Sequence, residues 1–494
     1  MYDMKPGVRG DYVGRDLQEA MALTANAIMG AKWHRLLLFA AIGVLVLLVY
    51  FIKPDSLGST HYEDGRSYNA KVPAWRRTLQ SSASNEPFDQ TIRTRERLCH
   101  EFEFGGYHLN ETGVSRKIVA NVTSCLVHCF SPYVEREAAK RFVDPAHDNI
   151  FYANSPAVIW YKGQLVLVTR IWLERERYEE KKNWPANHFA DNWLYTQKFD
   201  RYMRPVSNGS IIGIPLPKQW WVGDGPIEPR LVIHKGALYI TFNGAMAFSH
   251  DNNMDFTIMW DYDQNMAVIP KIKGGSPMVN ATEANDMPRD KHWMAFIQHG
   301  ELYFVHNLDP LRVMHCTDAG LCEFVHNEKN AEGFIFNHWV SHLRGGTPFV
   351  LYEWPYYISV AHSTMYKRDV HRRFYTAHMV VMCVEPYRLV YMSNHIEIHP
   401  SIYQDIPMVR ARYIDDGFIF PVGLILESKD SMVIGVHVND HSSVLFRISG
   451  IRAIMKRVIK TDKRKNPAHG PPIGFMHKLV HHAVEKVAHV RLES

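Results

Sequence analysis

Ionisable side chains gather at the two ends of a short hairpin-like segment, IEPRLVIHKGALYITFNG at residues 227–244. Glu228 and Arg230 begin its first apolar run, and Asn243 ends its second. A carboxylate can take the proton of an attacking hydroxyl, and a guanidinium binds phosphate through paired donors. This combination suits chemistry in which a sugar hydroxyl reacts beside an anionic group.

The same outline returns near Ser155, His292, Gly346 and Ile419, and polar residues again mark the ends of each segment. Aromatic faces stack on sugar rings, and Arg or Lys binds phosphate. The predicted substrate-binding residues are Arg230, Asn243, Lys291, Trp293, Asp309, Arg344, Gly345, Gly346, Thr347, His362, Lys367, Asp416 and His437.

Several of these candidates also have an ordinary structural interpretation. Glu228 can be a surface carboxylate paired with Arg230, and Asp309 can cap a turn. The stretch Arg344–Thr347 can be only a tight turn, or it can be an anion-binding nest in which backbone amides and a guanidinium act together.

Three histidines and an Asp-x-Asp pattern also have alternative interpretations. His362, His378 and His437 can be hydrogen-bonded core histidines. Asp261-Tyr-Asp263 matches the Asp-x-Asp clamp that holds manganese and a diphosphate in nucleotide-sugar transferases of Rossmann-like fold. The chain lacks the alternating strand–helix pattern of that fold, so we expect no metal and no cofactor.

The recurring segments predict the elements that position these residues. From residue 96 to about 450 the chain is rich in β-branched and aromatic residues, with turn residues every ~8–12 positions, which is all-β spacing. A unit of about 55–75 residues with a central hairpin has the size of a propeller blade. We predict an all-β catalytic domain at 96–455, a five-bladed β-propeller whose blade ends converge on one pocket; a large β-sandwich is the alternative.

The N-terminus predicts a membrane anchor. The chain has 494 residues, 46% apolar and 22% charged, and its net charge of +5 does not indicate a nucleic-acid surface. Leu36 to Ile52 carries no charge and as a helix spans about 26 Å, with basic residues on its N-terminal side. We predict a cytosolic tail (1–35), a single-pass type II signal anchor (36–52), a stem (53–95) and a lumenal catalytic domain in the Golgi or endoplasmic reticulum. A cleaved signal peptide is the alternative.

Sequons and cysteines agree with a lumenal domain. Asn-x-Ser/Thr sequons occur at Asn110, Asn121, Asn208 and Asn280. The 6 cysteines suit an oxidising compartment. Cys316 and Cys322 are predicted to form a local disulfide, whereas Cys125 and Cys129 can pair with each other or with Cys99. The basic extension 456–494 is predicted to be partly helical, with a partly ordered tail as the alternative.

Four blocks carry a resemblance to a known family. They are GPIEPRLVI with ITFN, KHWMAFIQHGELYFVHNLDPLRVMHC with GLCEF, HLRGGTPFV, and FIFPVGLIL. Over residues 95–450, and in its tail, anchor and stem, the chain resembles the fungal β-1,2-mannosyltransferases of glycosyltransferase family 91. It is more distantly similar to the five-bladed β-mannoside phosphorylases. The resemblance implies GDP-mannose as donor, an oligomannoside as acceptor and a role in cell-wall or glycoprotein glycans.

The resemblance also marks a departure. The phosphorylases carry Glu-Asp-Pro-Arg where this chain has Ile227-Glu-Pro-Arg230, so Glu228 takes the position of their catalytic Asp. Glu is one methylene longer, which displaces its carboxylate by about 1 Å, and misplacement of that order is costly for catalysis. Either the site has adjusted, or Glu228 binds sugar and Asp224, Asp309 or Asp415 is the base.

The resulting hypothesis is an inverting transfer. Glu228 acts as base, directly or through a sugar hydroxyl, while Arg230, Asn243 and Asp309 hold sugar hydroxyls. Arg344, His362 and Lys367 hold the diphosphate with the amides of Gly345 and Gly346. The alternatives are a β-mannoside phosphorylase or hydrolase, and a non-catalytic carbohydrate-binding propeller.

Overall fold

A computed structural model of the chain describes most residues between 98 and 462. The described ranges are 98–110, 113–142, 150–174, 191–214, 225–249, 252–275, 289–328, 342–367, 372–406 and 417–462, with the single residues 408 and 479. The chain divides into two units, 1–65 and 66–494, and every described residue lies in the second. The predicted tail, anchor and stem (1–95) lie outside the described residues. Within the described ranges, no helix is long and apolar enough to cross a membrane.

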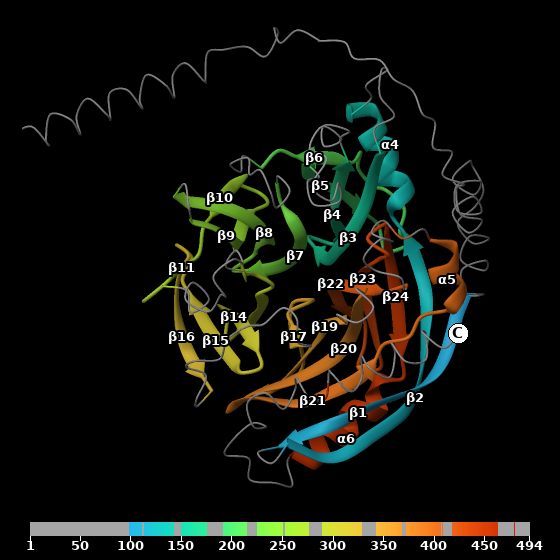
Figure 1. Ribbon diagram of the computed structural model, residues 1–494, viewed down its shortest axis with the longest axis vertical. Coiled ribbons are helices and arrows are strands. Elements are labelled where there is room, and N and C mark those ends of the chain that lie inside the picture. The colour runs from blue at the N-terminus through green and yellow to red at the C-terminus, as the bar shows by residue number, and fades with distance from the viewer. Residues whose placement is uncertain are drawn as a thin grey trace, which may run out of the picture. The chain divides into compact units, whose positions relative to one another are not determined.

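The described part of the chain is mostly β, which confirms the all-β prediction (Figure 1). Its main strands form five antiparallel groups of four. The first group is β3 (Ile150–Tyr161), β4 (Gln164–Glu174), β5 (Asp191–Phe199) and β6 (Ser210–Ile212). The second is β7 (Ile227–His234), β8 (Ala237–Ser249), β9 (Asn252–Asp261) and β10 (Met266–Val268). The third is β13 (Met294–Gln298), β14 (Glu301–Leu308), β15 (Leu311–Cys316) and β16 (Leu321–Asn327).

The last two groups contain the longest strands. The fourth is β18 (Val350–Glu353), β19 (Tyr356–Lys367), β20 (Arg372–Val384) and β21 (Tyr387–His395), with β17 (His342–Arg344) also on β19. The fifth is β22 (Ile419–Leu426), β23 (Ser431–Val438), β24 (Ser442–Ser449) and β2 (Gly113–Cys129). The short strands β11 (Lys271–Ile272) and β12 (Arg289–Asp290) pair with β16 and β9.

Each of the five predicted hairpins is present, as the first two strands of its group. The first three turn at Lys162-Gly163, Lys235-Gly236 and His299-Gly300, where both residues have positive φ. This is the type I′ geometry whose twist matches that of the flanking strands, and it explains the glycine in the second position.

Strand pairing does not separate the groups into five blades. Strand β1 (Cys99–Asn110) pairs with both β2 and β21, and Ser442 in β24 pairs with Ala153 in β3. The first, fourth and fifth groups thereby join in one 14-stranded sheet, while the other two form sheets of five strands. The long β1–β2 ribbon joins the fourth and fifth groups, because β1 pairs with β21 and β2 pairs with β24, whereas the first group is joined through the Ser442–Ala153 pair.

The first strands of the groups lie close to one another. Strand β7 contacts β3, β13 and β22, and β22 also contacts β3 and β19. Figure 1 places β3, β7 and β22 side by side. Large apolar clusters fill the spaces between groups; one of them joins residues of the first three groups, among them Val166, Ile240 and Phe304. This packing fixes the strand ends that carry the polar residues.

Three helices belong to the described chain. They are α4 (Ser131–Phe142), α5 (Pro400–Asp405) and α6 (Ile451–Asp462). Helix α6 buries Ile451, Ile454, Met455 and Val458 against the fourth and fifth groups, so the predicted boundary at 455 falls inside a packed helix. The helix expected within 474–490 lies outside the described residues apart from Leu479, which packs against a core cluster.

Two disulfides are present. Cys316–Cys322 confirms the predicted local pairing, and Cys99–Cys125 links opposite residues of β1 and β2. Cys129 and Cys383 are buried and not disulfide-bonded. Among the sequons, Asn121 and Asn208 are exposed and Asn110 is half-buried, while Asn280 lies outside the described residues.

Candidate active site

Glu228 sits at a bulge at the start of β7. The register with β8 shifts between Ile227 and Arg230, and Glu228 itself has φ 54°. Ser155 and His292, at the entrances of the first and third hairpins, also have positive φ. A left-handed conformation costs a non-glycine residue roughly 1–3 kcal/mol and is concentrated at functional sites. Because of the bulge, Glu228 does not follow the regular alternation of side chains between the two faces of the strand.

Neutral and cationic groups surround the Glu228 carboxylate. The Asn243 Nδ2 amide donates to Oε2 at 2.8 Å, and His292 Nε2 lies 2.9 Å from the same oxygen. Arg230 Nη2 lies 3.6 Å from Oε2. The exposed fraction of the Glu228 side chain is 14%, compared with 2% for Arg230 and 6% for His292. The Glu228 side chain is therefore mostly buried.

The carboxylate is ionised at neutral pH. Burial by itself would raise the pKa of Glu228, but the interactions with His292, Lys291 and Arg230 outweigh it and hold the pKa well below its ordinary value. Burial lowers the pKa of His292 to about 4, against the opposite effect of Glu228. The imidazole is therefore neutral at neutral pH.

The Arg230 side chain connects two turns of the chain, the Glu-Pro-Arg corner (228–230) and the Arg-Gly-Gly-Thr corner (344–347). Its Nε donates to the carbonyl oxygen of Gly346, and its Nη1 donates to the Glu228 carbonyl oxygen at 2.9 Å. A Cβ on Gly345 would lie 1.7 Å from the His292 oxygen, and one on Gly346 would lie 2.1 Å from the Val360 oxygen. The Arg230 side chain thus links the two corners, which are far apart in sequence, while the glycines leave no room for a Cβ against the backbones of His292 and Val360.

This arrangement gives the predicted residues structural contacts. Neither Gly345 nor Gly346 has φ in the left-handed region, and both allow close packing of the backbone. Arg230 and Asn243, which were predicted to hold sugar hydroxyls, both contact Glu228, and Asn243 Oδ1 also accepts from the His292 amide at 3.2 Å. These contacts position the carboxylate.

A series of rings in contact extends from Glu228 across the other groups. The ring centroids of His292 and His362 are 5.0 Å apart, those of His362 and Phe420 are 4.2 Å apart, and those of Phe420 and His437 are 4.9 Å apart. His437 Nδ1 lies 3.4 Å from a carboxylate oxygen of Asp440. The second to fifth groups therefore meet within a few side chains.

The first group reaches the same place through Asn154. Its Nδ2 donates to the backbone oxygen of Asp440 at 2.8 Å. The prediction that strand ends of all five groups converge is confirmed for these residues.

Two predicted cations lie beside the carboxylate or its neighbours. Lys291 lowers the pKa of both Glu228 and His292. Arg344 faces His362 across the β17–β19 pair, and its charge helps to lower the pKa of that histidine, although burial is the larger cause. His362 is consequently neutral, so it can donate or accept a hydrogen bond but cannot supply the positive charge that was predicted for it.

Trp293 and Thr347 have structural contacts, and Asp309 acts on a neighbouring carboxyl group. Trp293 is completely buried, and its indole N–H donates to Asp290 Oδ1 at 2.8 Å, so its ring has no face for a sugar. The Thr347 hydroxyl lies 2.9 Å from the Ser359 hydroxyl inside the fourth group. Asp309 follows β14; burial and its charge raise the pKa of Glu328 to about 7.

Other candidates are settled by their surroundings or lie outside the described chain. The ring nitrogens of His378 contact the Ser393 carbonyl at 2.9 Å and the Thr376 hydroxyl at 2.7 Å, so it is a satisfied core histidine. Asp261 Oδ1 accepts from two backbone amides of its own turn, at 3.0 and 2.8 Å, which explains the Asp-x-Asp pattern as a turn. Asp224, Asp415, Asp416 and the side chain of Lys367 are not described.

The sequence prediction did not include Phe420 or Asn154 in the site. It placed His292 and Asp440 among the polar residues at the hairpin ends but not among the substrate-binding residues. His292 directly precedes Trp293. The apolar environment expected for a tryptophan could have placed Trp293 in the core and His292 in the site.

Comparisons with known proteins give only distant likenesses. No family model matches the sequence, and no curated protein matches it. One similar structure represents the GH130 mannoside phosphorylases, a family described as containing hydrolases that target β-1,2-mannosidic linkages in Candida mannan; identity is 12%, coverage is 65% of this chain and 87% of that chain, and the TM-score is 0.42.

Two further structures show a similar degree of likeness. The β-1,2-mannobiose phosphorylase from Listeria innocua is 11% identical over 64% of this chain and 95% of that chain, with a TM-score of 0.41. A glycosyl hydrolase from Bacteroides ovatus is 10% identical over 60% and 83%, with a TM-score of 0.38. Identities and TM-scores this low give no information about the chemistry of the site in this chain.

Proposed function

We propose that this protein is an inverting glycosyltransferase that moves mannose from GDP-mannose to a mannoside acceptor in β-1,2 linkage. One observation carries the proposal: an ionised, mostly buried carboxylate, Glu228, lies where strand ends from several groups meet, with Lys291 and Arg230 beside it. The resemblance of the blocks around Glu228, Arg344 and Phe420 to the fungal β-mannosyltransferases supplies the identity of donor and acceptor.

The proposed reaction is a single displacement. The acceptor hydroxyl attacks C1 of the mannose as the bond from C1 to the diphosphate oxygen breaks, and the bonding electrons leave with GDP. The hydroxyl proton passes to Glu228, directly or through a sugar hydroxyl, and then to solvent. Attack opposite to the leaving group converts an α-linked donor into a β-linked product. In this proposal the acceptor approaches the carboxylate at the small exposed part of the Glu228 side chain.

The departing diphosphate needs positive charge. Arg344 and Lys291 are described cations whose charges act on the neutral His362 and on Glu228, as their effects on the pKa values of these residues indicate. Lys367 remains a proposed third cation. Fixed cations can take the place of a metal ion, so we propose that transfer needs none.

The fold and location are part of the proposal. We propose that the five groups close into a five-bladed propeller, which the contacts among β3, β7, β13 and β22 support. Strand β2 supports it as well, because it completes the fifth group and so joins the beginning of the domain to its end. A lumenal location, behind an N-terminal anchor in the Golgi or endoplasmic reticulum, is supported by the two disulfides.

A phosphorylase is the second candidate, because the cations that suit a diphosphate also suit inorganic phosphate. The test incubates the purified full-length chain with GDP-mannose and an oligomannoside, and in parallel with β-1,2-mannobiose and phosphate. We expect GDP release and a new β-1,2 linkage only in the first reaction. Mannose 1-phosphate formation in the second would replace transfer by phosphorolysis, and no turnover in either, across a panel of nucleotide sugars, would indicate a carbohydrate-binding protein.

A further inference from the structure

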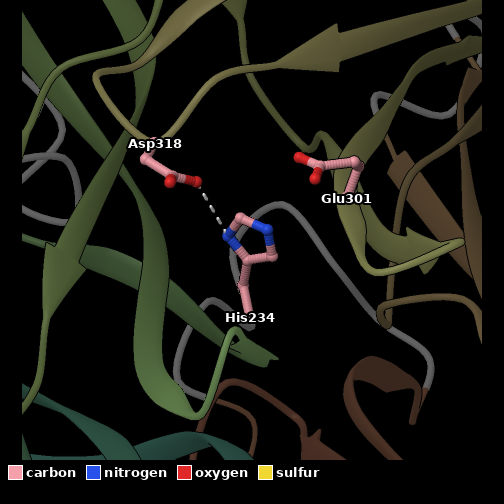
Figure 2. Close-up of side chains that lie close together, drawn as sticks. All are labelled: His234, Glu301 and Asp318. Carbon is pink, nitrogen blue, oxygen red and sulfur yellow. Dashed lines mark ion pairs between the residues drawn. The ribbon is translucent and has the colours of Figure 1, made fainter.

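A second group of ionisable residues lies at the opposite end of the second and third groups. His234 ends β7, Glu301 begins β14, and Asp318 lies in the turn between β15 and β16. One possible ligand atom from each residue lies within 4.8 Å of the others. Figure 2 shows the imidazole edge of His234 facing the two carboxylates. Three separate turns thus place one nitrogen and two oxygen ligands around a common point.

The histidine has features of a ligand. The exposed fraction of its side chain is 2%, and its Nδ1 lies 3.5 Å from Asp318 Oδ1. Ligands bound to zinc at about 2.0–2.2 Å in tetrahedral geometry are separated by about 3.4 Å, so Nδ1 and Asp318 are already at the spacing that zinc needs. The second ring nitrogen, Nε2, has no hydrogen-bond partner among the described residues, which is uncommon for a buried polar nitrogen. The ring is therefore not committed to another partner through Nε2.

The backbone that carries the two carboxylates is constrained by a disulfide loop and by a tight turn. Asp318 lies inside the short loop closed by the Cys316–Cys322 disulfide, and Glu301 directly follows the type I′ turn at His299-Gly300. Glu301 is about half exposed. A small side-chain rotation of this residue can therefore bring its oxygen to bonding distance without moving the strands.

Lys235 is the competing cation. Its ammonium lies 3.1 Å from Asp318 and 3.4 Å from Glu301, and its side chain is half exposed. The two carboxylates are therefore gathered around a positive charge that a lysine can withdraw into solvent. A divalent ion would take the position of the ammonium between the two carboxylates. It would also bind the imidazole nitrogen of His234, so it would have one more ligand than the ammonium has.

We propose that His234, Glu301 and Asp318 bind a divalent transition metal of the zinc type, with water in the fourth position and Lys235 displaced. Imidazole with carboxylates selects such ions over magnesium or calcium. The ion would connect the β7–β8 turn with turns of the third group and would stabilise the fold. This inference is independent of the transfer reaction.

The test measures zinc binding by the purified full-length chain through calorimetry and bound-metal analysis. Other histidines can bind zinc weakly, so the readout is the difference between variants. We expect one tight equivalent in the wild-type protein, lost or weakened at least about 100-fold in His234→Gln and Asp318→Asn. Lys235→Met should bind about tenfold more tightly, since the competitor is gone. Cobalt(II) at the site should give the intense visible absorption of tetrahedral coordination.

The control for zinc binding is a histidine paired with a single carboxylate. His100 pairs with Glu397 at 3.2 Å without a third acidic ligand in the cluster, so His100→Gln should leave the tight equivalent intact. If His234→Gln fails to fold, the exposed Asp318→Asn and Lys235→Met still decide the matter. Equal zinc affinity in wild type, Asp318→Asn and Lys235→Met would overturn the proposal, as would a wild-type chain with no tight equivalent.

Discussion

The two ends of strand β7 use the same three kinds of side chain in opposite environments. At one end, Glu228 meets Arg230 and His292, and the side chains of these three residues are at most 14% exposed. At the other end, about 20 Å away along the strand, His234 meets Lys235 and Asp318, and the last two are at least half exposed. The difference teaches that burial, rather than residue type, decides what an ion pair does.

At the buried end each partner is obligatory, because a lone charge in a low-dielectric environment is strongly unfavourable. The result is a fixed, ionised carboxylate. At the exposed end, water screens the charges and each pair contributes little. A cation can therefore be exchanged there without disturbing the fold. The first arrangement suits catalysis and the second suits reversible binding.

Removing the buried carboxylate is expected to give the largest effect. Glu228→Gln keeps the size and the contact with Asn243 but cannot accept a proton, so transfer should fall by about 10³-fold or more. The measurement is GDP release with acceptor present. Glu301→Gln, the matched change at the exposed end, should stay within about twofold. A Glu228→Gln enzyme with near-normal turnover would remove Glu228 as the base.

Replacing the cation at each end of β7 should change the free energy of unfolding by different amounts. Arg230→Met leaves the Glu228 carboxylate and the Gly346 oxygen without their buried partner, and should reduce the free energy of unfolding by about 3–5 kcal/mol. Lys235→Met removes an exposed pair and should cost less than about 1 kcal/mol. Urea unfolding of both variants checks the difference. Equal losses would mean that Arg230 is as well solvated as Lys235.

The pH dependence of stability tests the buried imidazole. The pKa of His292 is about 4 in the folded protein and about 6.5 when unfolded, so the unfolded chain binds the extra proton between these values. Stability should therefore fall as the pH drops from about 6.5 to about 4, and His292→Gln should remove about 3 kcal/mol of that loss.

His378 serves as the control for this experiment. Burial also lowers its pKa to about 4, but it lies in the core of the fourth group, on β20. His378→Gln should flatten the pH dependence equally while transfer activity is retained, whereas His292→Gln should reduce both. If unfolding free energies of the two variants and wild type ran parallel from pH 6.5 to 4, neither imidazole would be neutral in the fold.

The sequence predicts the hairpins but not the atoms that meet between them. Residue pairs such as Lys235-Gly236 require a turn locally, and Cys316 and Cys322 are close in sequence, so both features are readable from short stretches. The contact between Arg230 and Gly346 depends on the packing of two groups, and so does the choice between His292 and Trp293. The positive φ of His292 has no signal in the local sequence pattern.

A chelator is expected to give the smallest effect and to separate the two ends completely. With zinc bound at the His234 end, EDTA should lower the midpoint of thermal unfolding by about 5 °C. Transfer of mannose should be unchanged, because fixed cations rather than a metal face the leaving group. In His234→Gln the midpoint should not respond to EDTA. Loss of activity in EDTA, restored by manganese, would place a metal at the reacting end, and would require Asp261 to leave the turn that it now caps.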